Sequence, residues 1–328
     1  MNVRPSILCP IDFSEASSGA LRYAAVIASH FGTRLIVLAV EDPLLTEALD
    51  LGTGVVWDPE LCKREMRQFA AKTFGKDTPG LAALEYEVAV GKPAPEILRV
   101  ARERSCDLIV MSTHGLTGAR KLFFGSTTER VLRETTRPVL ITPAHDPGPF
   151  RIEDAKRLLG RVLVPLDLTP ASLHQAHVAR GIAEALSMPL LAVHVVEPVR
   201  SRLAAKLHSA SVEANRRAVA EDRLSEIIAT TPRRLHAESL IAYGDPAEEI
   251  AKVARDRQAG LIVVGLHGSP LLGPRMGSVT YRLLCLSPAL VLALPPMHLE
   301  TAYDEVHQRP RAVEVPTMPM TAMARTGV

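Results

Sequence analysis

The sequence predicts two copies of one α/β domain, fused head to tail, each with a parallel sheet covered by helices on both faces. The first observation is that motif blocks recur in the same order at a nearly constant separation. The second is that each copy alternates short apolar runs with helical patterns, which is typical of βαβ units. The length of 328 residues also fits two domains of roughly 150 residues.

The repeat is carried by five pairs of blocks, separated by 152 to 155 residues. The paired blocks are Ser6–Ser14 with Arg161–Thr169, Leu38–Val40 with Val193–Val195, Val90–Ala94 with Tyr243–Ala247, Asp107–Gly115 with Gly260–Gly268, and Gly125–Ser126 with Gly277–Ser278. Five matches in one order indicate an internal duplication, and this repeat alone predicts two equivalent domains.

Each copy offers five strand candidates. In the first copy they are Ser6–Ile11, Arg34–Val40, Glu85–Val90, Leu108–Met111 and Val139–Thr142. In the second they are Val162–Leu166, Leu190–Val196, Ala237–Ala242, Leu261–Val264 and Ala289–Leu294. Continuous apolar runs of this length, bounded by turn residues, are typical of strands covered on both faces.

Helix signals fall between these strands. Ser14 is the expected cap of a helix through about His30, and Gly32 suits its end. The pair Thr169–Pro170 predicts a second helix start, with proline in the first turn. The run Ser126–Glu129 has the spacing of a capping box and predicts the start of the last helix of the first copy.

These patterns set the expected domain boundaries. The first domain is predicted at 1–146, a proline-rich linker at 147–160, the second domain at 161–296, and a tail at 297–328. The tail has neither helical nor strand periodicity and is interpreted as a mobile segment, with a partner-binding arm as the alternative.

Composition excludes several classes of partner. A net charge of +2, from 38 basic and 36 acidic residues, gives no electrostatic footprint for nucleic acid. No stretch approaches the roughly 20 apolar residues that cross a bilayer, so no membrane association is expected. The four cysteines form no CxxC pair, and residues 1–10 carry no secretion signature. We therefore expect a reduced, cytoplasmic protein.

The candidate site lies where the strands end, because ligands of doubly wound sheets bind at the carboxyl ends of the strands. Asp12 and Asp167 each end the first strand of their copy. Such a carboxylate can accept hydrogen bonds from a bound base or ribose. It can equally well cap the following helix, and the residues alone leave both interpretations open.

After the fourth strand of the first copy comes a glycine-rich segment, Met111–Ser126. Gly125 and Ser126 lead into a helix N-terminus, whose N–H groups favour phosphate, and Thr127 adds a hydroxyl. The alternative is a glycine-rich turn that binds nothing. No HExxH, GxSxG, Walker A or GxGxxG motif accompanies it, so neither a metal centre nor a dedicated catalyst is expected.

This segment resembles the universal stress protein signature, in which glycine, two residues, glycine, nine residues, glycine and serine or threonine follow one another. In the first copy the matching positions are Gly115, Gly125 and Ser126, with Ser112 in place of the first glycine. In the second copy they are Gly265, Gly268, Gly277 and Ser278, with eight residues in the longer interval instead of nine. The resemblance extends over about 3–143 and 161–296.

The resemblance implies two Rossmann-like domains of the adenine nucleotide alpha hydrolase type, each with five parallel strands. It also implies ATP as the ligand, with or without Mg²⁺. The nucleotide-binding residues carried over are Asp12, Val40, Ser112, Gly115, Gly125, Ser126 and Thr127 in the first copy, and Asp167, Val195, Gly265, Gly268, Gly277 and Ser278 in the second.

The leading hypothesis is an ATP-binding stress-response regulator that acts on an unidentified protein partner. The first site is expected to be the stronger, because the shorter second loop carries Pro270 and Pro274, which remove N–H donors. With no general base evident, any ATP hydrolysis should be slow. The alternative is a non-catalytic scaffold with one or no working site. The resemblance also implies an intramolecular pseudo-dimer through Val139–Thr142 and Leu290–Leu294, and two chains associating as a homodimer.

Overall fold

The computed structural model describes residues 5–44, 58–75, 83–113, 125–143, 159–198, 209–229, 235–269 and 273–296. The predicted tail at 297–328 and all but the end of the predicted linker lie outside these residues. The domain boundaries at 146 and 161 therefore stay predictions. No helix in the described part of the chain is long and apolar enough to span a membrane.

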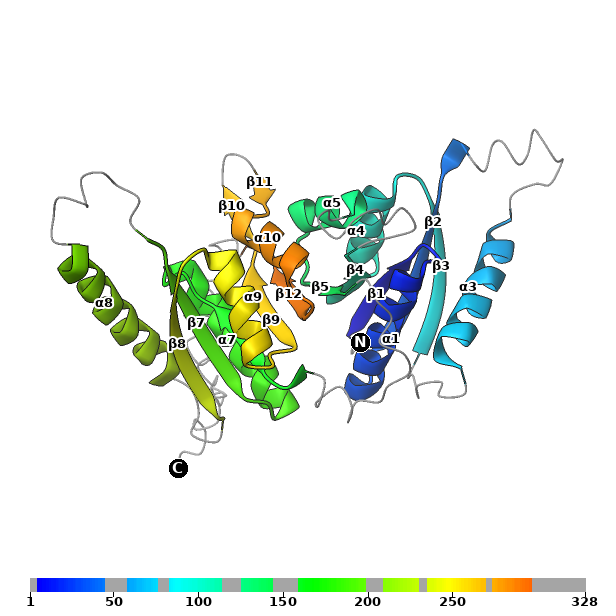
Figure 1. The fold of residues 1–328 in the computed structure, drawn as a ribbon. Helices are drawn as coiled ribbons and strands as arrows, with labels where there is room; N and C mark the ends of the chain where they lie inside the picture. Colours follow the sequence, from blue (N-terminus) through cyan, green and yellow to red (C-terminus); the bar gives the residue numbers. More distant parts are fainter. Residues whose placement is uncertain are drawn as a thin grey trace, which may run out of the picture. The chain divides into compact units, whose positions relative to one another are not determined.

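The first half alternates strands and helices in the predicted order (Figure 1). Its elements are β1 (Ser6–Ile11), α1 (Glu15–Phe31), β2 (Arg34–Glu41), α3 (Pro59–Phe74), β3 (Ala83–Val90), α4 (Pro93–Glu103), β4 (Leu108–Ser112), α5 (Ser126–Glu134) and β5 (Val139–Thr142). All five predicted strands of this half are confirmed, to within one or two residues at their ends.

The second half repeats this order and adds a short ribbon. Its elements are β6 (Val162–Pro165), α7 (Pro170–Leu186), β7 (Leu190–Val196), α8 (Ser209–Ala229), β8 (Ala237–Tyr243), α9 (Pro246–Asp256), β9 (Leu261–Gly265), β10 (His267–Ser269), β11 (Gly273–Arg275), α10 (Ser278–Leu286) and β12 (Leu290–Leu294). Its five predicted strands are confirmed, whereas the β10–β11 ribbon was not predicted.

Apart from the β10–β11 ribbon, the strands of both halves form a single sheet. Among the described residues its order is β3-β2-β1-β4-β5-β12-β9-β6-β7-β8. Pairing is parallel within each half, as predicted, and antiparallel where β12 meets β5. The expected edge-to-edge pairing of the two last strands is thereby confirmed. In each half the strand order reverses beside the first strand, between β1 and β4 and between β6 and β9.

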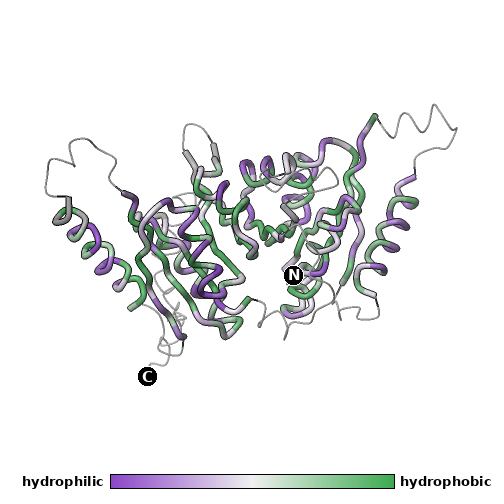
Figure 2. Tube along the Cα trace, in the orientation of Figure 1, coloured by the Kyte–Doolittle hydropathy of each residue, from purple (hydrophilic) through white to green (hydrophobic). Residues whose placement is uncertain are grey.

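Two hydrophobic layers cover the faces of this sheet. Side chains alternate along each strand, so that Ile7 and Cys9 face one layer and Leu8 faces the other. Helices α1, α3, α7 and α8 contribute to the first layer, and α4, α5, α9 and α10 to the second. Figure 2 shows the hydrophobic residues concentrated along the strands. Both layers continue across the β5–β12 pair and connect the two cores.

Helix α1 follows the predicted capping. The Ser14 side chain accepts a hydrogen bond from the Ser17 N–H at 3.1 Å, and Gly32 ends the helix in the left-handed region with φ 61°. Thr169 also occupies its predicted N-cap position before α7, but its side chain makes no capping hydrogen bond. The Thr169 hydroxyl instead donates to Asp167.

The predicted capping box at Ser126–Glu129 is wrong. Gly125 occupies the N-cap of α5, with φ −61° and ψ 133°, and Ser126 is already the first helical residue. Glu129 pairs with Arg133 at 2.7 Å instead of reaching back to a cap. A capping box needs serine at the cap itself, so the one-residue shift removes the interaction.

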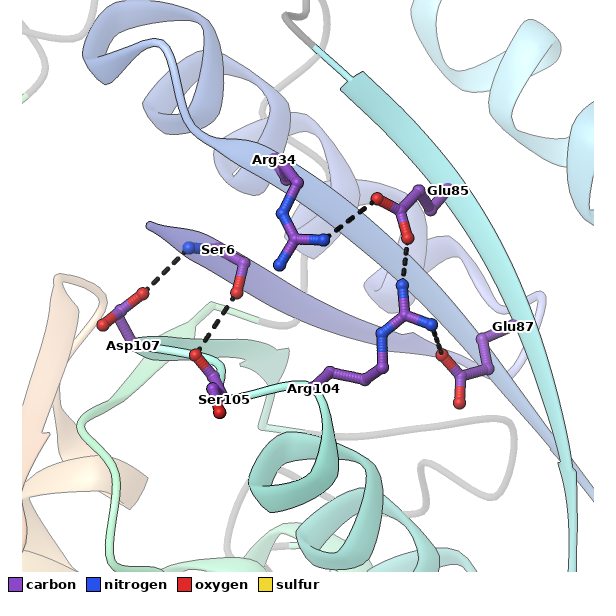
Figure 3. Close-up of polar contacts among 7 residues, drawn as sticks. All are labelled: Ser6, Arg34, Glu85, Glu87, Arg104, Ser105 and Asp107. Carbon is purple, nitrogen blue, oxygen red and sulfur yellow. Dashed lines mark hydrogen bonds and ion pairs between the residues drawn. The ribbon is translucent and has the colours of Figure 1, made fainter. Parts of the chain in front are cut away.

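At the amino ends of the strands, polar contacts tie neighbouring strands of the first half together (Figure 3). Arg34 of β2 lies 3.3 Å from the Glu85 carboxylate of β3, and Arg104 also pairs with Glu85. The Ser6 N–H donates to the Asp107 carboxylate at 2.8 Å, which links β1 to the start of β4. The polar cluster thus stabilises the edge opposite to the predicted site.

Two glycines allow a matched test of these backbone assignments. An added Cβ at Gly32 or at Gly181 meets no heavy atom within 4 Å, so alanine at either position differs only in backbone preference. We expect Gly32→Ala to lower the free energy of unfolding by about 1–2 kcal/mol, because φ is positive. Gly181→Ala, inside α7, should raise it by about 0.5–1 kcal/mol. Urea denaturation of both variants measures the two signs, and equal signs would contradict the assignments.

Candidate functional site

The carboxyl ends of β1, β2 and β4 meet at one edge of the first half, and those of β6, β7 and β9 meet at the equivalent edge of the second. The reversals of strand order lie at these places. In a doubly wound sheet such a reversal opens a crevice between the loops that leave to opposite faces. The predicted site residues that the structure describes all lie along these two edges.

In the first half, Asp12 forms a tight turn between β1 and α1. Its carboxylate accepts hydrogen bonds from the Ser14 N–H at 3.1 Å and from the Ser14 hydroxyl. Phe13 between them takes the left-handed region with φ 61°, which is uncommon for a bulky residue. This turn lets one carboxylate oxygen orient the cap of α1.

The second half repeats this turn. Asp167 accepts from the Thr169 N–H at 3.0 Å and from the Thr169 hydroxyl at 2.7 Å, and Leu168 has φ 63°. In each aspartate, therefore, one carboxylate oxygen orients the N-terminus of the following helix, as the capping interpretation expects. The role of both aspartates in ligand binding stays a prediction.

The last helix of each half begins at a glycine on the same edge. Gly125 and Gly277 are the N-caps of α5 and α10, and neither helix start has a side-chain capping hydrogen bond. Ser126 and Ser278 are the first helical residues and are exposed. The N-terminal N–H groups of a helix and its dipole favour an anion. Each edge therefore combines a carboxylate with an anion-favouring helix end.

In the second half these groups surround a cavity of about 430 Å³. Its walls come from β6, β7 and β9, the first two turns of α9 and the start of α10, together with Gln175 of α7 and Arg216 of α8. The cavity is lined by five predicted site residues, namely Asp167, Val195, Gly265, Gly277 and Ser278. Its volume lies in the range of roughly 300–1,000 Å³ that is usual for small-molecule sites.

Gln175 of α7 lies at the base of this cavity and was not predicted. Its amide nitrogen donates to the carbonyl oxygens of Pro165, at 2.6 Å, and Val263, at 2.9 Å. Its amide oxygen accepts from the Gly265 N–H at 3.1 Å. One side chain thus joins the ends of β6 and β9 at the point where the strand order reverses.

Gln175 also explains why the two halves differ at the first glycine of the motif. An added Cβ at Gly265 would lie 3.0 Å from the Gln175 amide oxygen. The first half has Ala20 at the position of Gln175 and Ser112 at that of Gly265. Glycine at 265 avoids crowding the glutamine, whose amide would have to shift by a few tenths of an ångström to admit a Cβ, whereas the first half combines the shorter alanine with serine.

His194 of β7 is the second cavity residue that was not predicted. Its Nδ1 lies 2.8 Å from the Leu166 carbonyl oxygen, which can only accept, so Nδ1 carries the proton. In the neutral ring Nε2 is then a hydrogen-bond acceptor for a ligand N–H group. The first half has Ala39 at this position. A histidine replacing alanine was the only sequence signal for this difference.

The glycine segments of the two halves are described to different extents. In the second, Gly268 lies in the β10–β11 ribbon, opposite Pro274. In the first, Gly115 lies outside the described residues, Ser112 ends β4, and the Ser112 carbonyl accepts from the Thr128 hydroxyl at 3.0 Å. The structure therefore gathers Asp12, Val40, Ser112, Gly125, Ser126 and Thr127 at the edge of the first half.

Two doubly wound halves, each with a carboxylate and a glycine-capped helix at its carboxyl edge, define a tandem Rossmann-like α/β protein. The model described as "Universal stress protein family" matches residues 4–143 and 159–295. The chain belongs to the universal stress protein family and carries two copies of its domain.

Relatives of single-domain length match one half of the chain. Universal stress protein MJ0531 of Methanocaldococcus jannaschii is 31% identical over 142 residues, which are 43% of this chain and 82% of that protein. Universal stress protein YxiE of Bacillus subtilis is 32% identical over 143 residues, which are 41% of this chain and 96% of that protein.

Solved structures match the tandem arrangement. A protein of unknown function from Pseudomonas aeruginosa PAO1 has a TM-score of 0.61 at 18% identity, over 93% of this chain and 97% of its own. A universal stress protein from Archaeoglobus fulgidus has a TM-score of 0.60 at 20% identity, over 88% and 98%. At these identities the likeness concerns the fold.

A double-mutant cycle tests the contact between Gln175 and Gly265. We expect Gly265→Ala to lower the free energy of unfolding by about 1–2 kcal/mol, because three hydrogen bonds hold the glutamine against the new methyl group. In a Gln175→Ala background the same change should cost close to nothing. Denaturant unfolding of the four proteins gives the coupling energy, expected at about 1–2 kcal/mol. Equal costs in both backgrounds would contradict this account of Gly265.

Proposed function

We propose that the chain binds adenine nucleotides, ATP foremost, at the carboxyl edge of each half and acts as a nucleotide-dependent regulator of the stress response. The bound nucleotide favours one arrangement of the glycine segment and so alters the surface offered to a protein partner. A ligand has this effect only if it binds the two arrangements with different affinity.

The observation that carries the proposal is the same pair of groups at both edges. A carboxylate ends the first strand, and a glycine without side-chain capping begins the last helix. The first group suits a ribose or base, and the second suits phosphates. Family resemblance assigns the same positions to an adenine nucleotide.

The residues proposed to contact the nucleotide fall into two groups. Base and ribose are assigned to Asp12 and Val40 in the first half and to Asp167 and Val195 in the second. Ribose and phosphates are assigned to Ser112, Gly115, Gly125, Ser126 and Thr127, and to Gly265, Gly268, Gly277 and Ser278. Mg²⁺ accompanies ATP as its counter-ion in this proposal.

The first-half site is proposed to be the stronger. In the second half the Gly265 N–H already donates to Gln175, so a ligand must displace this bond or forgo the donor. A neutral hydrogen bond contributes about 0.5–1.5 kcal/mol net, which corresponds to roughly two- to tenfold in affinity. Gly268 lies in a paired ribbon, which restricts how this segment closes over phosphate.

Regulation, and not catalysis, suits these sites. Asp12 and Asp167 each use a carboxylate oxygen to hold the start of a helix, which leaves them poorly suited to activating water. Any hydrolysis of ATP should be slow. The four cysteines are free, three of them buried, and we place the protein in the reducing cytoplasm on that basis.

The alternative function is an interaction scaffold with one or no working nucleotide site. The occupied Gly265 N–H favours this alternative for the second half. The two functions differ in whether ATP binds saturably and in how many nucleotides a chain takes up.

Glutamate substitutions at the two cap glycines test the proposal site by site. Gly125 and Gly277 have φ −61° and −63°, which other residues adopt without strain. We expect Gly125→Glu to weaken ATP binding at the stronger site at least tenfold, because a carboxylate is placed against the phosphates. Gly277→Glu should abolish only ATP binding at the weaker, second-half site. Isothermal titration calorimetry of full-length variants measures both effects.

Gly125→Ala and Gly277→Ala are the matched controls, since they add a methyl group without charge. They should retain binding within a few-fold. If wild type binds no ATP, the scaffold function replaces the regulator. If both glutamate variants bind ATP like wild type, the assignment of the phosphates to Gly125 and Gly277 is wrong.

A further inference from the structure

A second cavity, of about 510 Å³, lies away from both nucleotide edges. It lies between helices α1 and α7, over the pair of strands β5 and β12 that joins the two halves. Residues from both halves line it, so it exists only because the two domains are joined.

The lining follows the internal duplication. Ile27 of α1 and Ile182 of α7 are equivalent residues, and both line the cavity. Leu140 of β5 and Leu292 of β12 are also equivalent, and they are direct partners in the antiparallel pair. The cavity therefore lies on the pseudo-twofold axis that relates the halves.

The chemistry of the walls is apolar. None of the described residues that line the cavity is charged, and most are leucine, isoleucine, valine, alanine or proline. Phe31, at the end of α1, lines the cavity with 53% of its surface exposed. The exposed Phe31 and Gly181 show that the cavity opens to the surface, and an apolar pocket of this kind favours apolar ligands.

Gly181 contributes directly to this space. It lies inside α7, where glycine weakens a helix relative to alanine, and it lines the cavity. An added Cβ there meets no heavy atom within 4 Å. The equivalent residue in α1 is Val26, which is buried. The second half thus lacks a side chain at the point where the first half has one.

We propose that this cavity binds the aliphatic chain of a lipid-like molecule, an acyl or alkyl chain whose polar head group stays outside. The volume is that of a small-molecule site, roughly 300–1,000 Å³. The largely aliphatic walls, which carry no charged side chain among the described lining residues, favour a hydrocarbon chain over a charged ligand. This site is separate from the nucleotide edges, and its test does not depend on nucleotide binding.

Filling the cavity from Gly181 tests the proposal. The probe is 11-(dansylamino)undecanoic acid, whose fluorescence rises in apolar surroundings, with 1-dodecanol as the uncharged competitor. Full-length wild type should bind one probe per chain, and dodecanol should displace it. Gly181→Leu should weaken binding at least tenfold, because the new side chain occupies the cavity. Gly181→Ala, which improves the helix and fills little space, should bind within about threefold of wild type.

Thermal unfolding shows whether a loss of probe binding by Gly181→Leu comes from a filled cavity or from a destabilised fold. Gly181→Leu should unfold no lower than wild type, since the cavity has room for its side chain. Equal probe binding by wild type and a folded Gly181→Leu would overturn the proposal, as would the absence of saturable binding by wild type. Sedimentation is run in parallel: a wild-type dimer that Gly181→Leu dissociates, with no dodecanol binding, would make the cavity an interface with a second copy and contradict the proposal.

Discussion

The antiparallel pairing of β5 with β12 determines how the rest of this molecule is arranged. Residues 139–141 of one half lie opposite residues 291–293 of the other. The pairing covers an edge strand of each half, which would otherwise present unpaired N–H and C=O groups. It also makes the two hydrophobic layers continuous, since Leu140 and Leu292 join one layer and Ile141 and Val291 join the other. The apolar cavity between α1 and α7 follows from the same junction.

Most of the fold could be predicted from the sequence because the chain contains the same pattern twice. Runs such as Leu261–Val264 are apolar on every residue, and their short length and flanking turn residues favour a strand covered on both faces over a buried helix. The exact strand ends could not be predicted, since they depend on partners: Gly265 extends β9 because it pairs with Leu294 of β12. The start of α5 was misplaced by one residue, because glycine and serine both favour a cap and the sequence does not say which of them occupies it.

The candidate site was only partly predictable. The edge carrying Asp12 and Asp167 follows from strand order, which the repeat made clear. Gln175 could not be found from local sequence, because its contacts reach Val263 and Gly265, far along the chain. The signal appears only when equivalent positions of the two halves are compared. The second half has Gln175 and Gly265 where the first half has alanine and serine. Side chains such as Gln175 contact residues that are distant in the sequence, and the periodicity of apolar residues does not reveal such contacts.

The two halves therefore share a framework but not a site. In the first, the small residues Ala20 and Ala39 occupy two positions beside the strand ends. In the second, Gln175 and His194 replace them and engage backbone groups at the strand ends. Native mass spectrometry of the full chain over a range of ATP concentrations tests this asymmetry most directly. The account predicts one nucleotide per chain at low ATP and a second only at higher ATP. No retained nucleotide mass at any concentration, or two filling together at equal affinity, would contradict it.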